Sequence, residues 1–385
     1  MDTTTRAAYV RGGTSKGLVF HAADLPPQRA DWEPIFLSAM GSPDPYGRQL
    51  NGMGGGLSSL SKVCVVAPSS RADVDVEYTF AQVRIAQPEV DFSGNCGNMT
   101  SAIGPFAIDE GIVAGVADGP VNVRLFNVNT EKVIVARFEV LGGNSVIDPW
   151  TKLEGVEGPA TKVVLDFLNP GGSATGALLP TRRVRDYLIL GDGSRIEASL
   201  IDAANPCVFV SAASVGCTGA ELPHDLSADN ELLHRLEQIR IAASLAMGIA
   251  ETAEAAHANR TTPFIAIVAP PAPFTALDGR TYTASSMSAS IRFLSNGQPH
   301  RAIPGTGAIC AATAALMPGS VVATMIHKDS AMTEAPTLVR LGHPSGCTDT
   351  TASIESTDTG PHVVSASLVR TTRRLFDGRV HHVRA

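Results

Sequence analysis

Short runs of apolar residues rich in valine and isoleucine, many of them alternating with polar residues, recur along most of the chain. Runs of about 4–8 residues with this character, bounded by turn-forming residues, are typical of β-strands. They predict strands at residues 62–67, 74–85, 121–126, 132–141, 162–167, 195–202, 264–269 and 288–293. Two further strands are expected at 361–370 and 371–383, the second broken by a hairpin turn at Asp377-Gly378.

A helical repeat of apolar positions is clear in one segment, residues 230–247. Its apolar residues share one face of a helix: Leu232, Leu236, Ile239, Ala243 and Met247. Two other helices are expected at 99–110 and 308–317, because each segment directly follows a tight glycine turn. The pattern as a whole predicts a β-rich protein with few helices.

The two glycine turns, at 93–98 and 304–307, lie one in each half of the chain. This spacing suggests two similar domains, and the strand pattern is interrupted between them by the polar run TRRVRD. We expect a first domain at 1–183, carrying Lys62 and Cys96, and a second at 184–385, carrying the turn that begins at Pro304. The final strand is free to return to the first domain.

Composition narrows the function without identifying it. The chain has 385 residues, of which 44% are hydrophobic and 17% charged, and its formal net charge is −7. Because the charges form no long runs, nucleic acid and anionic membranes are not expected as partners. No apolar run reaches the ~18–20 residues of a membrane span and the N-terminus lacks a signal-peptide core, so we expect a cytoplasmic protein. A small anionic substrate would need a locally basic pocket.

The six cysteines are scattered without a CxxC pair, so neither a zinc site nor a disulfide scaffold is expected. Cys96 differs from the others because it lies where a glycine turn meets a helix, a position that favours the thiolate form. Cys64, inside a strand, and Cys310, inside a helix, are expected to be buried thiols. The roles of Cys207, Cys217 and Cys347 stay open.

The starts of the two glycine-turn helices are candidate anion sites, because a helix N-terminus offers unpaired N–H groups and a partial positive charge. Two such ends could hold a dicarboxylate; the alternative is that the glycines only make turns. The candidate residues are Asn95, Gly97 and Asn98 in the first half, and Arg301, Gly305, Thr306 and Gly307 in the second.

A loop rich in glycine and serine runs from Gln49 to Lys62 and then enters a strand. It matches neither a P-loop nor a GxGxxG pattern, so nucleotide binding is not expected. Its amides and hydroxyls could instead hold carboxylates and present Lys62 to them, although a solvated surface lysine is the simpler interpretation. The candidate binding residues are Asn51, Gly54, Gly55, Ser58 and Ser59.

Residues 13–17 match the GxSxG pattern of hydrolases, but a strand follows where that motif requires a helix. We therefore reject a hydrolase. The segment is better interpreted as another anion-binding turn. Its candidate residues are Thr14 and Ser15, with Arg11 and Lys16 adding positive charge.

Taken together, several long motifs resemble those of the PrpF-like family of 2-methylaconitate cis–trans isomerases and 4-oxalomesaconate isomerases or tautomerases. They are RGGTSKG (11–17), GSPDPYGRQLNGMGGG (41–56), SSLSK (58–62), SGNCGNM (93–99), FLNP (167–170), TGAEL (218–222), AIPGTGAI (302–309), GHPSG (342–346) and LVRTTRRLFDG (368–378). The resemblance covers nearly the whole chain. It implies an α+β, diaminopimelate-epimerase-like fold, with two similar domains that each wrap a curved, mostly antiparallel sheet around a central helix.

The resemblance also implies a mechanism. Epimerases of this fold use two cysteines, one at each helix start, whereas this chain keeps Cys96 and has Pro304 at the second turn. That difference agrees with the isomerase branch, in which a lysine matching Lys62 pairs with the first cysteine. The implied reaction is a 1,3-allylic proton shift without a cofactor or metal, with Lys62 as base and the reverse assignment of the two roles left open.

Among substrates, the closing LVRTTRRLFDG and the turn PGTGA resemble the aromatic-catabolism members of the family. They favour allylic isomerisation of 4-oxalomesaconate, ahead of its keto–enol tautomerisation and of 2-methylaconitate isomerisation. The expected partner is thus a small polycarboxylate, and a homodimer stays open. A noncatalytic accessory protein that binds a polycarboxylate is the alternative from another class.

Overall fold

The computed structural model describes residues 2–326, 337–358 and 360–383 of the chain. They form two compact units: unit 1 comprises Met1–Asp166 and Val369–Ala385, and unit 2 comprises Phe167–Leu368. The boundary after Asp166 lies earlier in the chain than the one expected at 183, because the segment that follows it forms hydrogen bonds with other residues of unit 2. Asp202 accepts hydrogen bonds from Ser173 Oγ and from the N–H groups of Ala174 and Thr175.

The main sheet of unit 1 has the strand order β1, β2, β3, β4, β6, β7. Successive neighbours are antiparallel, parallel, antiparallel, parallel and antiparallel. The strands are β1 (Asp2–Gly12), β2 (Ser15–His21), β3 (Lys62–Pro68), β4 (Val76–Val83), β6 (Gly119–Asn127) and β7 (Lys132–Leu141). The unit also contains β5 (Val90–Asp91), β8 (Asn144–Ser145), α1 (Trp32–Met40), α2 (Gly97–Asp109) and all but the last two residues of β9 (Thr161–Leu168).

Unit 2 repeats this arrangement in the order β11, β12, β13, β16, β18, β19, with the same succession of antiparallel and parallel pairs. These strands are β11 (Arg195–Asp202), β12 (Pro206–Ser211), β13 (Phe264–Ala269), β16 (Ala289–Ser295), β18 (Thr337–His343) and β19 (Gly346–Thr357). The other elements are β10 (Asp186–Ile189), β14 (Phe274–Thr275), β15 (Thr281–Tyr282), β17 (Gln298–Pro299), α3 (Pro223–Ala228), α4 (Asn230–Ala246), α5 (Ala253–Ala258), α6 (Gly305–Ala315) and α7 (Val321–Met325).

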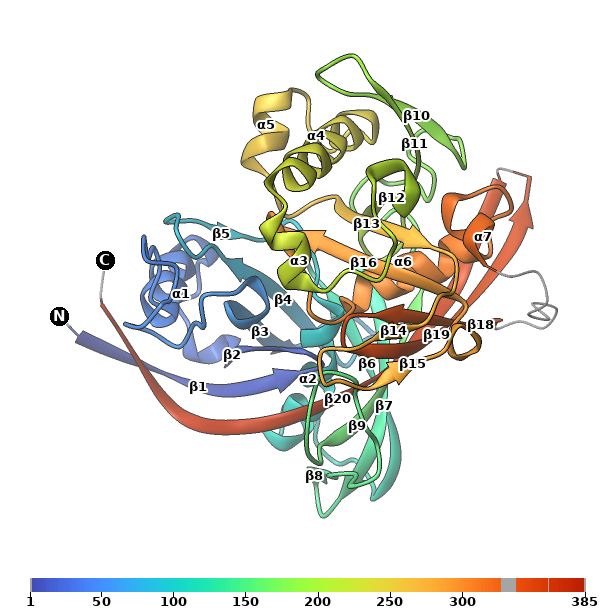
Figure 1. Cartoon of the computed structure of the whole chain (residues 1–385). Coiled ribbons are helices and arrows are strands. Elements are labelled where there is room, and N and C mark those ends of the chain that lie inside the picture. Colours follow the sequence, from blue (N-terminus) through green and yellow to red (C-terminus); the bar gives the residue numbers. More distant parts are fainter. Residues whose placement is uncertain (1, 327–336, 359, 384–385) are drawn as a thin grey trace. The chain divides into compact units, whose positions relative to one another are not determined.

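Each unit encloses one helix, visible within its strands in Figure 1. In unit 1 this helix is α2, buried from Gly97 to Ile108 and in contact with β1, β2, β3, β6 and β7. In unit 2 it is α6, buried along its whole length and in contact with β11, β12, β18 and β19. A helix with small or apolar residues on every side belongs in a core. The repeated topology makes the two helix starts, at Cys96 and Pro304, equivalent positions.

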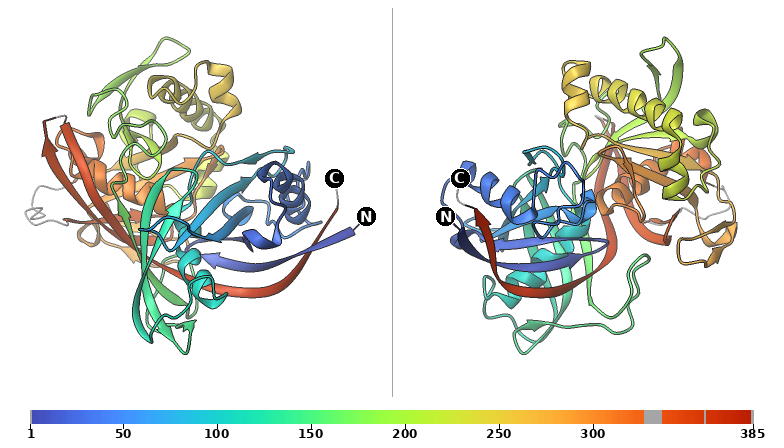
Figure 2. Two further views of the ribbon diagram at one scale, coloured as in Figure 1. Left: turned by 180° about the vertical axis from the view of Figure 1, so that it is seen from behind. Right: turned by 60° about the vertical axis from the view of Figure 1, so that its left-hand side comes forward.

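The C-terminal strand, β20 (Gly360–Val383), corrects one sequence prediction. Its first part pairs with β19, and its last part pairs with β1 over the segment where a hairpin was expected, with Ala8 opposite Asp377 and Ala7 opposite Gly378. Gly378 does not have the positive φ that a type I′ turn requires. Figure 2 shows β1 and the end of β20 as long curved ribbons lying side by side.

Candidate functional site

The start of α2 holds Cys96 in a defined position. Cys96 is the N-cap residue, and its N–H donates to Asn95 Oδ1 at 2.7 Å. The same amide oxygen accepts from the buried Tyr78 hydroxyl at 3.1 Å, while Thr100 Oγ1 donates to the Cys96 carbonyl at 3.0 Å. No side chain caps the helix by a hydrogen bond. The half-buried thiol therefore lies beside helix N–H groups that are available to an anion.

The tight turn between β1 and β2 lies against this helix start. Ser15 Oγ is 4.0 Å from Cys96 Sγ, and Asn98 Nδ2 donates to Thr14 Oγ1 at 3.0 Å. Gly13, with φ +53°, passes so close to Asn98 that any side chain at position 13 would collide with that amide. The structure therefore brings together residues of the two predicted anion-binding turns.

Lys62 is the first residue of β3 and is only 8% exposed, so the interpretation as a solvated surface lysine is wrong. Its Nζ donates to Gln82 Oε1 at 2.5 Å and lies 5.1 Å from the centroid of the Phe80 ring. Gln82 is opposite Lys62 in the β3–β4 ladder. The Gln82 amide is oriented in turn, because its Nε2 donates to the carbonyls of Ser58 and Ser61.

A second thiol, that of Cys64, is influenced by both Lys62 and Cys96. Burial raises the pKa of Cys64 well above its usual range; the charge of Cys96 raises it further, and that of Lys62 lowers it. Lys62 and Cys96 thus act on the same buried group, two residues along β3 from Lys62. Burial also raises the pKa of Tyr78, which keeps the hydroxyl a neutral donor beside Asn95.

The loop before Lys62 is held by a glutamine that sequence reasoning did not single out. Gln49 is 1% exposed; its Nε2 donates to Ser61 Oγ at 2.7 Å and its Oε1 accepts from the Gly56 N–H at 3.0 Å. Its amide packs against Gly54, where an added side chain would collide with it. Among the other predicted loop residues, Gly55 is exposed and Ser58 and Ser59 open the short 3₁₀ helix Ser58–Leu60.

Asn51 is placed differently. It is exposed and borders a separate surface hollow, together with Tyr46, Arg48 and Leu50. The contacts of the described residues do not bring it to Cys96 or Lys62.

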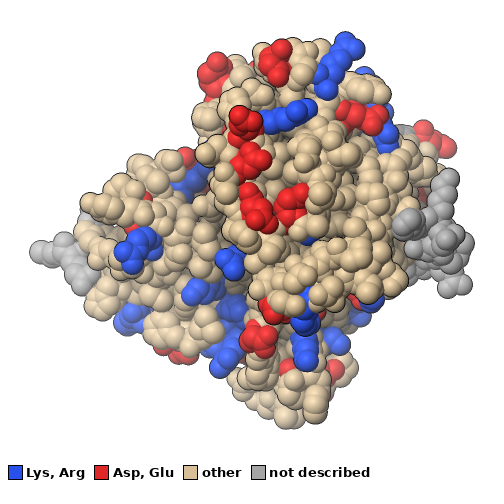
Figure 3. All heavy atoms as spheres, viewed as in Figure 1, with Lys and Arg blue, Asp and Glu red and all other residues tan. Residues whose placement is uncertain are grey.

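Two basic residues, Arg11 and Lys16, flank the turn between β1 and β2 and have different surroundings. Arg11 Nη1 donates to the carbonyls of Gly13 and Thr371, so its guanidinium supports the turn. Burial, and then the neighbouring Arg373, lower the pKa of Arg11 to about 10. Lys16 is half-buried, with Nζ 5.5 Å from the centroid of the Tyr9 ring. Figure 3 shows Lys and Arg side chains gathered over β1 and the end of β20, a locally basic surface on an otherwise acidic protein.

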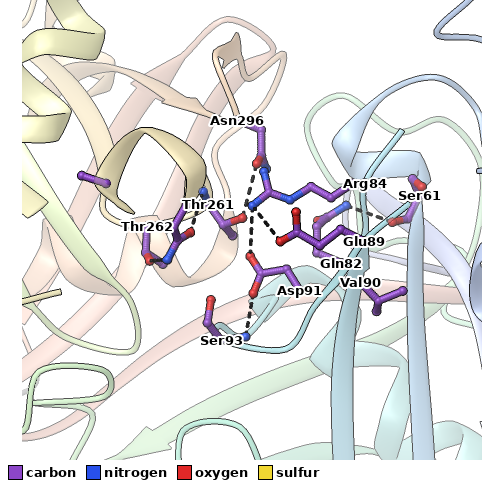
Figure 4. Close-up of polar contacts among 12 residues, drawn as sticks. Ser61, Gln82, Arg84, Glu89, Val90, Asp91, Ser93, Thr261, Thr262 and Asn296 are labelled. Atoms are coloured by element: carbon purple, nitrogen blue, oxygen red, sulfur yellow. Dashed lines mark hydrogen bonds and ion pairs between the residues drawn. The ribbon is translucent and has the colours of Figure 1, made fainter. Parts of the chain in front are cut away.

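The segment leading into the helix start is fixed by an acidic residue. Asp91 Oδ1 accepts from the Ser93 N–H at 2.8 Å, and Asp91 Oδ2 lies 3.7 Å from Arg84 Nη2 (Figure 4). Arg84 also pairs with Glu89, across 3.8 Å. Within residues 2–326, 337–358 and 360–383, no three His, Cys, Asp or Glu side chains come together as a set that could hold a metal ion.

In unit 2, Gly305, Thr306 and Gly307 form the buried first turn of α6, with Pro304 as N-cap residue. An added side chain at Gly307 would lie 2.9 Å from the Pro304 ring and 3.0 Å from Phe293. Arg301 is exposed, and its carbonyl accepts from Ser345 Oγ at 2.6 Å. The second helix start is therefore tightly packed and carries no thiol.

The remaining cysteines are free thiols with distinct surroundings. Cys207 and Cys310 are buried, as Cys310 was predicted to be, and burial followed by its neighbour Cys310 raises the pKa of Cys207. Burial, followed by the charge of Glu221, raises the pKa of Cys217 to about 11. Cys347 is half-buried beside the small apolar cluster of Phe274, Ala276 and Met287.

The chain is similar to known proteins over nearly its whole length. The profile of the family described as PrpF protein matches residues 2–383. A Bacillus subtilis (strain 168) protein named YraM, described as an isomerase, is 40% identical over 378 residues, covering 98% of this chain and 97% of the relative. The 2-methyl-aconitate isomerase of Shewanella oneidensis is 38% identical, and the (4E)-oxalomesaconate Delta-isomerase of Novosphingobium sp. is 37% identical. Each match covers 97% of this chain and 96% of the relative.

Solved structures of other proteins superpose on this chain over nearly its whole length. A methylitaconate-delta-isomerase superposes with a TM-score of 0.79 and 34% identity, covering 99% of this chain and 96% of the other. A hydroxyproline epimerase from Agrobacterium vitis superposes with a TM-score of 0.54 at 11% identity, covering 98% and 92%. The second match concerns the fold alone, and it confirms the epimerase-like α+β architecture.

Proposed function

The chain belongs to the PrpF family and is an isomerase; on that premise we propose that it catalyses a cofactor-independent 1,3-allylic proton shift on an unsaturated tricarboxylate, 4-oxalomesaconate being the favoured substrate. The observation that carries this proposal is that unit 1 holds both a buried lysine oriented by Gln82 and a cysteine at an uncapped helix start, and that both act on the buried Cys64.

The buried amine is suited to removing a proton from carbon. A lysine accepts a proton only in its neutral form, and its remaining N–H can donate to a carbonyl while the lone pair faces the substrate. Gln82 Oε1 is such a carbonyl partner for Lys62 Nζ and fixes the direction of the amine. Because Gln82 is itself held by two backbone carbonyls, the lysine head has little freedom to turn away.

The proposed reaction conserves atoms and electrons. Neutral Lys62 takes a proton from the carbon next to the double bond; that C–H bond breaks, an N–H bond forms, and the electron pair spreads as a dienolate onto a carboxylate or keto oxygen. The Cys96 thiol then gives its proton to the carbon two positions away, so that an S–H bond breaks and a C–H bond forms. Returning one proton from Lys62 to Cys96 restores the starting state. The reverse assignment, with Cys96 as base, stays an alternative.

The carboxylate groups of the substrate need hydrogen-bond donors that are already in position before the substrate binds. The free N–H groups at the start of α2, together with the Thr14 and Ser15 hydroxyls, supply such donors beside Cys96. Preorganised donors stabilise the charge that develops on oxygen in a dienolate. The basic surface over β1 and β20 favours the approach of a polyanion.

The choice of 4-oxalomesaconate within this class depends on the motifs LVRTTRRLFDG and PGTGA, which resemble those of the aromatic-catabolism members. Similarity to the named relatives does not separate the substrates, since those that act on 2-methyl-aconitate and oxalomesaconate are 38% and 37% identical. Keto–enol tautomerisation of 4-oxalomesaconate and isomerisation of 2-methylaconitate remain the alternatives. A noncatalytic binding protein is set aside, because the relatives are isomerases.

The cytoplasm is part of the same proposal. All six cysteines, which lie within the described residues, are free thiols, including two pairs of neighbours: the buried Cys64 with the half-buried Cys96, and the buried Cys207 with the buried Cys310. Free thiols are the usual state in a reducing compartment.

The test is an assay with purified protein and no added cofactor. Each of the two candidate substrates, 4-oxalomesaconate and 2-methylaconitate, is incubated separately, and loss or gain of conjugation is followed by ultraviolet absorbance. Proton NMR in D₂O then identifies which carbon gains deuterium. We expect the highest kcat/KM on 4-oxalomesaconate, with deuterium at the allylic carbon. Turnover of 2-methylaconitate alone would make that acid the substrate, and no turnover of either acid would refute the proposed reaction.

A further inference from the structure

Arg370 is a buried arginine that is not among the site residues predicted from the sequence. It lies on the part of β20 that belongs to unit 1, and its side chain is 1% exposed. Its Nε donates to Asn98 Oδ1 at 2.9 Å and its Nη1 to the Val369 carbonyl at 3.0 Å. Asn98 is in the first turn of α2, two residues after Cys96. The guanidinium thus lies directly behind the helix start that carries the thiol.

A buried guanidinium normally requires a counter-charge, because an unpaired charge away from water is costly. Two other arginines of this chain are similarly enclosed. Arg240, 2% exposed, pairs with Glu237 across 2.9 Å, and the charge of Glu221 stabilises the cation of Arg292. Among the described residues, no carboxylate lies within ion-pair distance of Arg370, and the group whose ionised form would stabilise its charge is Cys96.

The interaction between Arg370 and Cys96 is mutual. Burial lowers the pKa of Arg370 to about 10, and an ionised Cys96 acts in the opposite direction. If a negative charge on Cys96 stabilises the protonated guanidinium, the guanidinium stabilises that negative charge by the same free energy. Because the side chain lies within the core of unit 1, solvent screens this interaction less than it would at a surface.

On the basis of the proposed function, in which Cys96 exchanges a proton, we propose that Arg370 is a positioning residue that holds Asn98 at the helix start and places a fixed positive charge behind the helix start that carries Cys96. It provides a fixed cation for the moment when Cys96 has given up its proton. It touches neither the sulfur nor the reacting atoms, and acts through the first turn of α2 and through its charge.

Other titratable groups surround the thiol and must be held constant in any test. Lys62 and Cys64 lie on β3, and Tyr78 on β4 reaches Asn95, the residue before Cys96. On β1 and β2, Arg11 and Lys16 flank the turn that carries Ser15. Substitutions at Arg370 leave all of these groups in place.

The experiment separates the charge of Arg370 from its hydrogen bond. Arg370→Gln keeps an N–H donor for Asn98 but removes the charge. Arg370→Lys keeps the charge but replaces the planar guanidinium, with its several N–H donors, by an ammonium group. The rate of carboxamidomethylation of Cys96 by iodoacetamide is followed from pH 6 to 10 by peptide mapping, which distinguishes it from the other cysteines. Arg292→Gln, the same change at an enclosed arginine of unit 2, is the matched control.

We expect Arg370→Gln to slow the modification of Cys96 at pH 7 by about tenfold, the effect of losing one nearby opposite charge. Arg370→Lys and Arg292→Gln should stay within about twofold of the wild type. Equal rates in the glutamine and lysine variants would overturn the proposal. Where the glutamine variant does not fold, the lysine variant decides alone, because a tenfold fall in its rate would show that the charge is not what matters.

This measurement needs no substrate and is therefore independent of the proposed reaction. If the wild-type protein turns over neither of the two acids, the proposed function fails, whatever the alkylation profile. If turnover is found and the profile does not respond to Arg370→Gln, only the inference about Arg370 fails. In an active protein, Arg370→Gln should also lower kcat more than it raises KM, because the charge acts on proton transfer and not on substrate binding.

Discussion

Replacing Lys62 is the most informative perturbation of the proposed site. Because the side chain is 8% exposed and bonded to Gln82 Oε1, Lys62→Ala removes a buried donor and leaves the Gln82 acceptor unpaired. An unpaired buried polar group costs about 1–3 kcal/mol. The fold should therefore survive with a lower melting temperature, a larger effect than is expected for the loop-end surface lysine that the sequence suggests.

The effect on turnover is expected to be larger than the effect on stability. A positioned acid–base group contributes ~10²-fold or more to the rate, equivalent to about 2.7 kcal/mol of transition-state stabilisation. We therefore expect kcat of Lys62→Ala to fall by at least ~10² while KM changes only modestly. If Lys62 only held a carboxylate, KM would rise and kcat would stay close to that of the wild type.

Lys62→Met separates the two effects, since methionine fills much of the space of the lysine stem without the amine. Lys162→Ala, at an exposed lysine on β9, serves as the control for loss of a unit 1 cation. Initial rates over a range of substrate concentrations give kcat and KM, and circular dichroism melting curves report the fold. A folded Lys62→Met variant with turnover near that of the wild type would refute the mechanism.

Three further outcomes follow from the structure. Gly13→Ala should destabilise unit 1 by about 1–3 kcal/mol and lower activity, because Gly13 has φ +53° and its Cβ would collide with Asn98; an unchanged melting temperature would contradict this packing. Activity should survive exhaustive dialysis against EDTA, and loss with EDTA followed by recovery with a divalent metal would contradict the metal-free mechanism. Stability should fall as pH rises above the ordinary cysteine pKa of about 8.5, because burial raises the pKa of Cys64 and Cys207 in the folded state, so that these thiols ionise first in the unfolded chain. Urea unfolding midpoints at pH 7.5 and 10, compared with those of a Cys64→Ala/Cys207→Ala variant, test the sign; equal slopes with pH in both proteins would contradict it.

Local pattern was sufficient for much of the secondary structure. Strands β7, β11 and β13 match the predicted runs, and α4 matches the predicted amphipathic helix to within a residue at its C-terminal end. The two glycine turns also begin helices as expected, and their packing shows why they are glycine-rich: Gly307, for example, faces Pro304 and Phe293 at about 3 Å. These features depend on residues close in sequence, so periodicity and turn chemistry suffice to find them.

The pairing of strands that lie far apart in the sequence could not be predicted from local pattern. The expected hairpin at Asp377-Gly378 does not form, because β1 supplies a continuous partner from the opposite end of the chain. A dipeptide with turn propensity adopts an extended conformation when its backbone groups gain a full ladder of hydrogen bonds. The strands β12, β18 and β19 were not predicted either; β19 includes several threonines and serines whose place in a sheet depends on its neighbours β18 and β20.

The amino-acid sequence by itself determined which groups are available: one lysine after a glycine-rich loop, one cysteine at a helix start, and a proline at the equivalent second turn. The tertiary structure decided their states. Lys62 is buried because β2 and β4 flank it, and it is oriented because the ladder places Gln82 opposite. Arg370 lies behind Cys96 because β20 returns to β1, where it meets Asn98. Charge, burial and orientation depend on which distant strands pair, and the register of that pairing is a property of the folded chain as a whole.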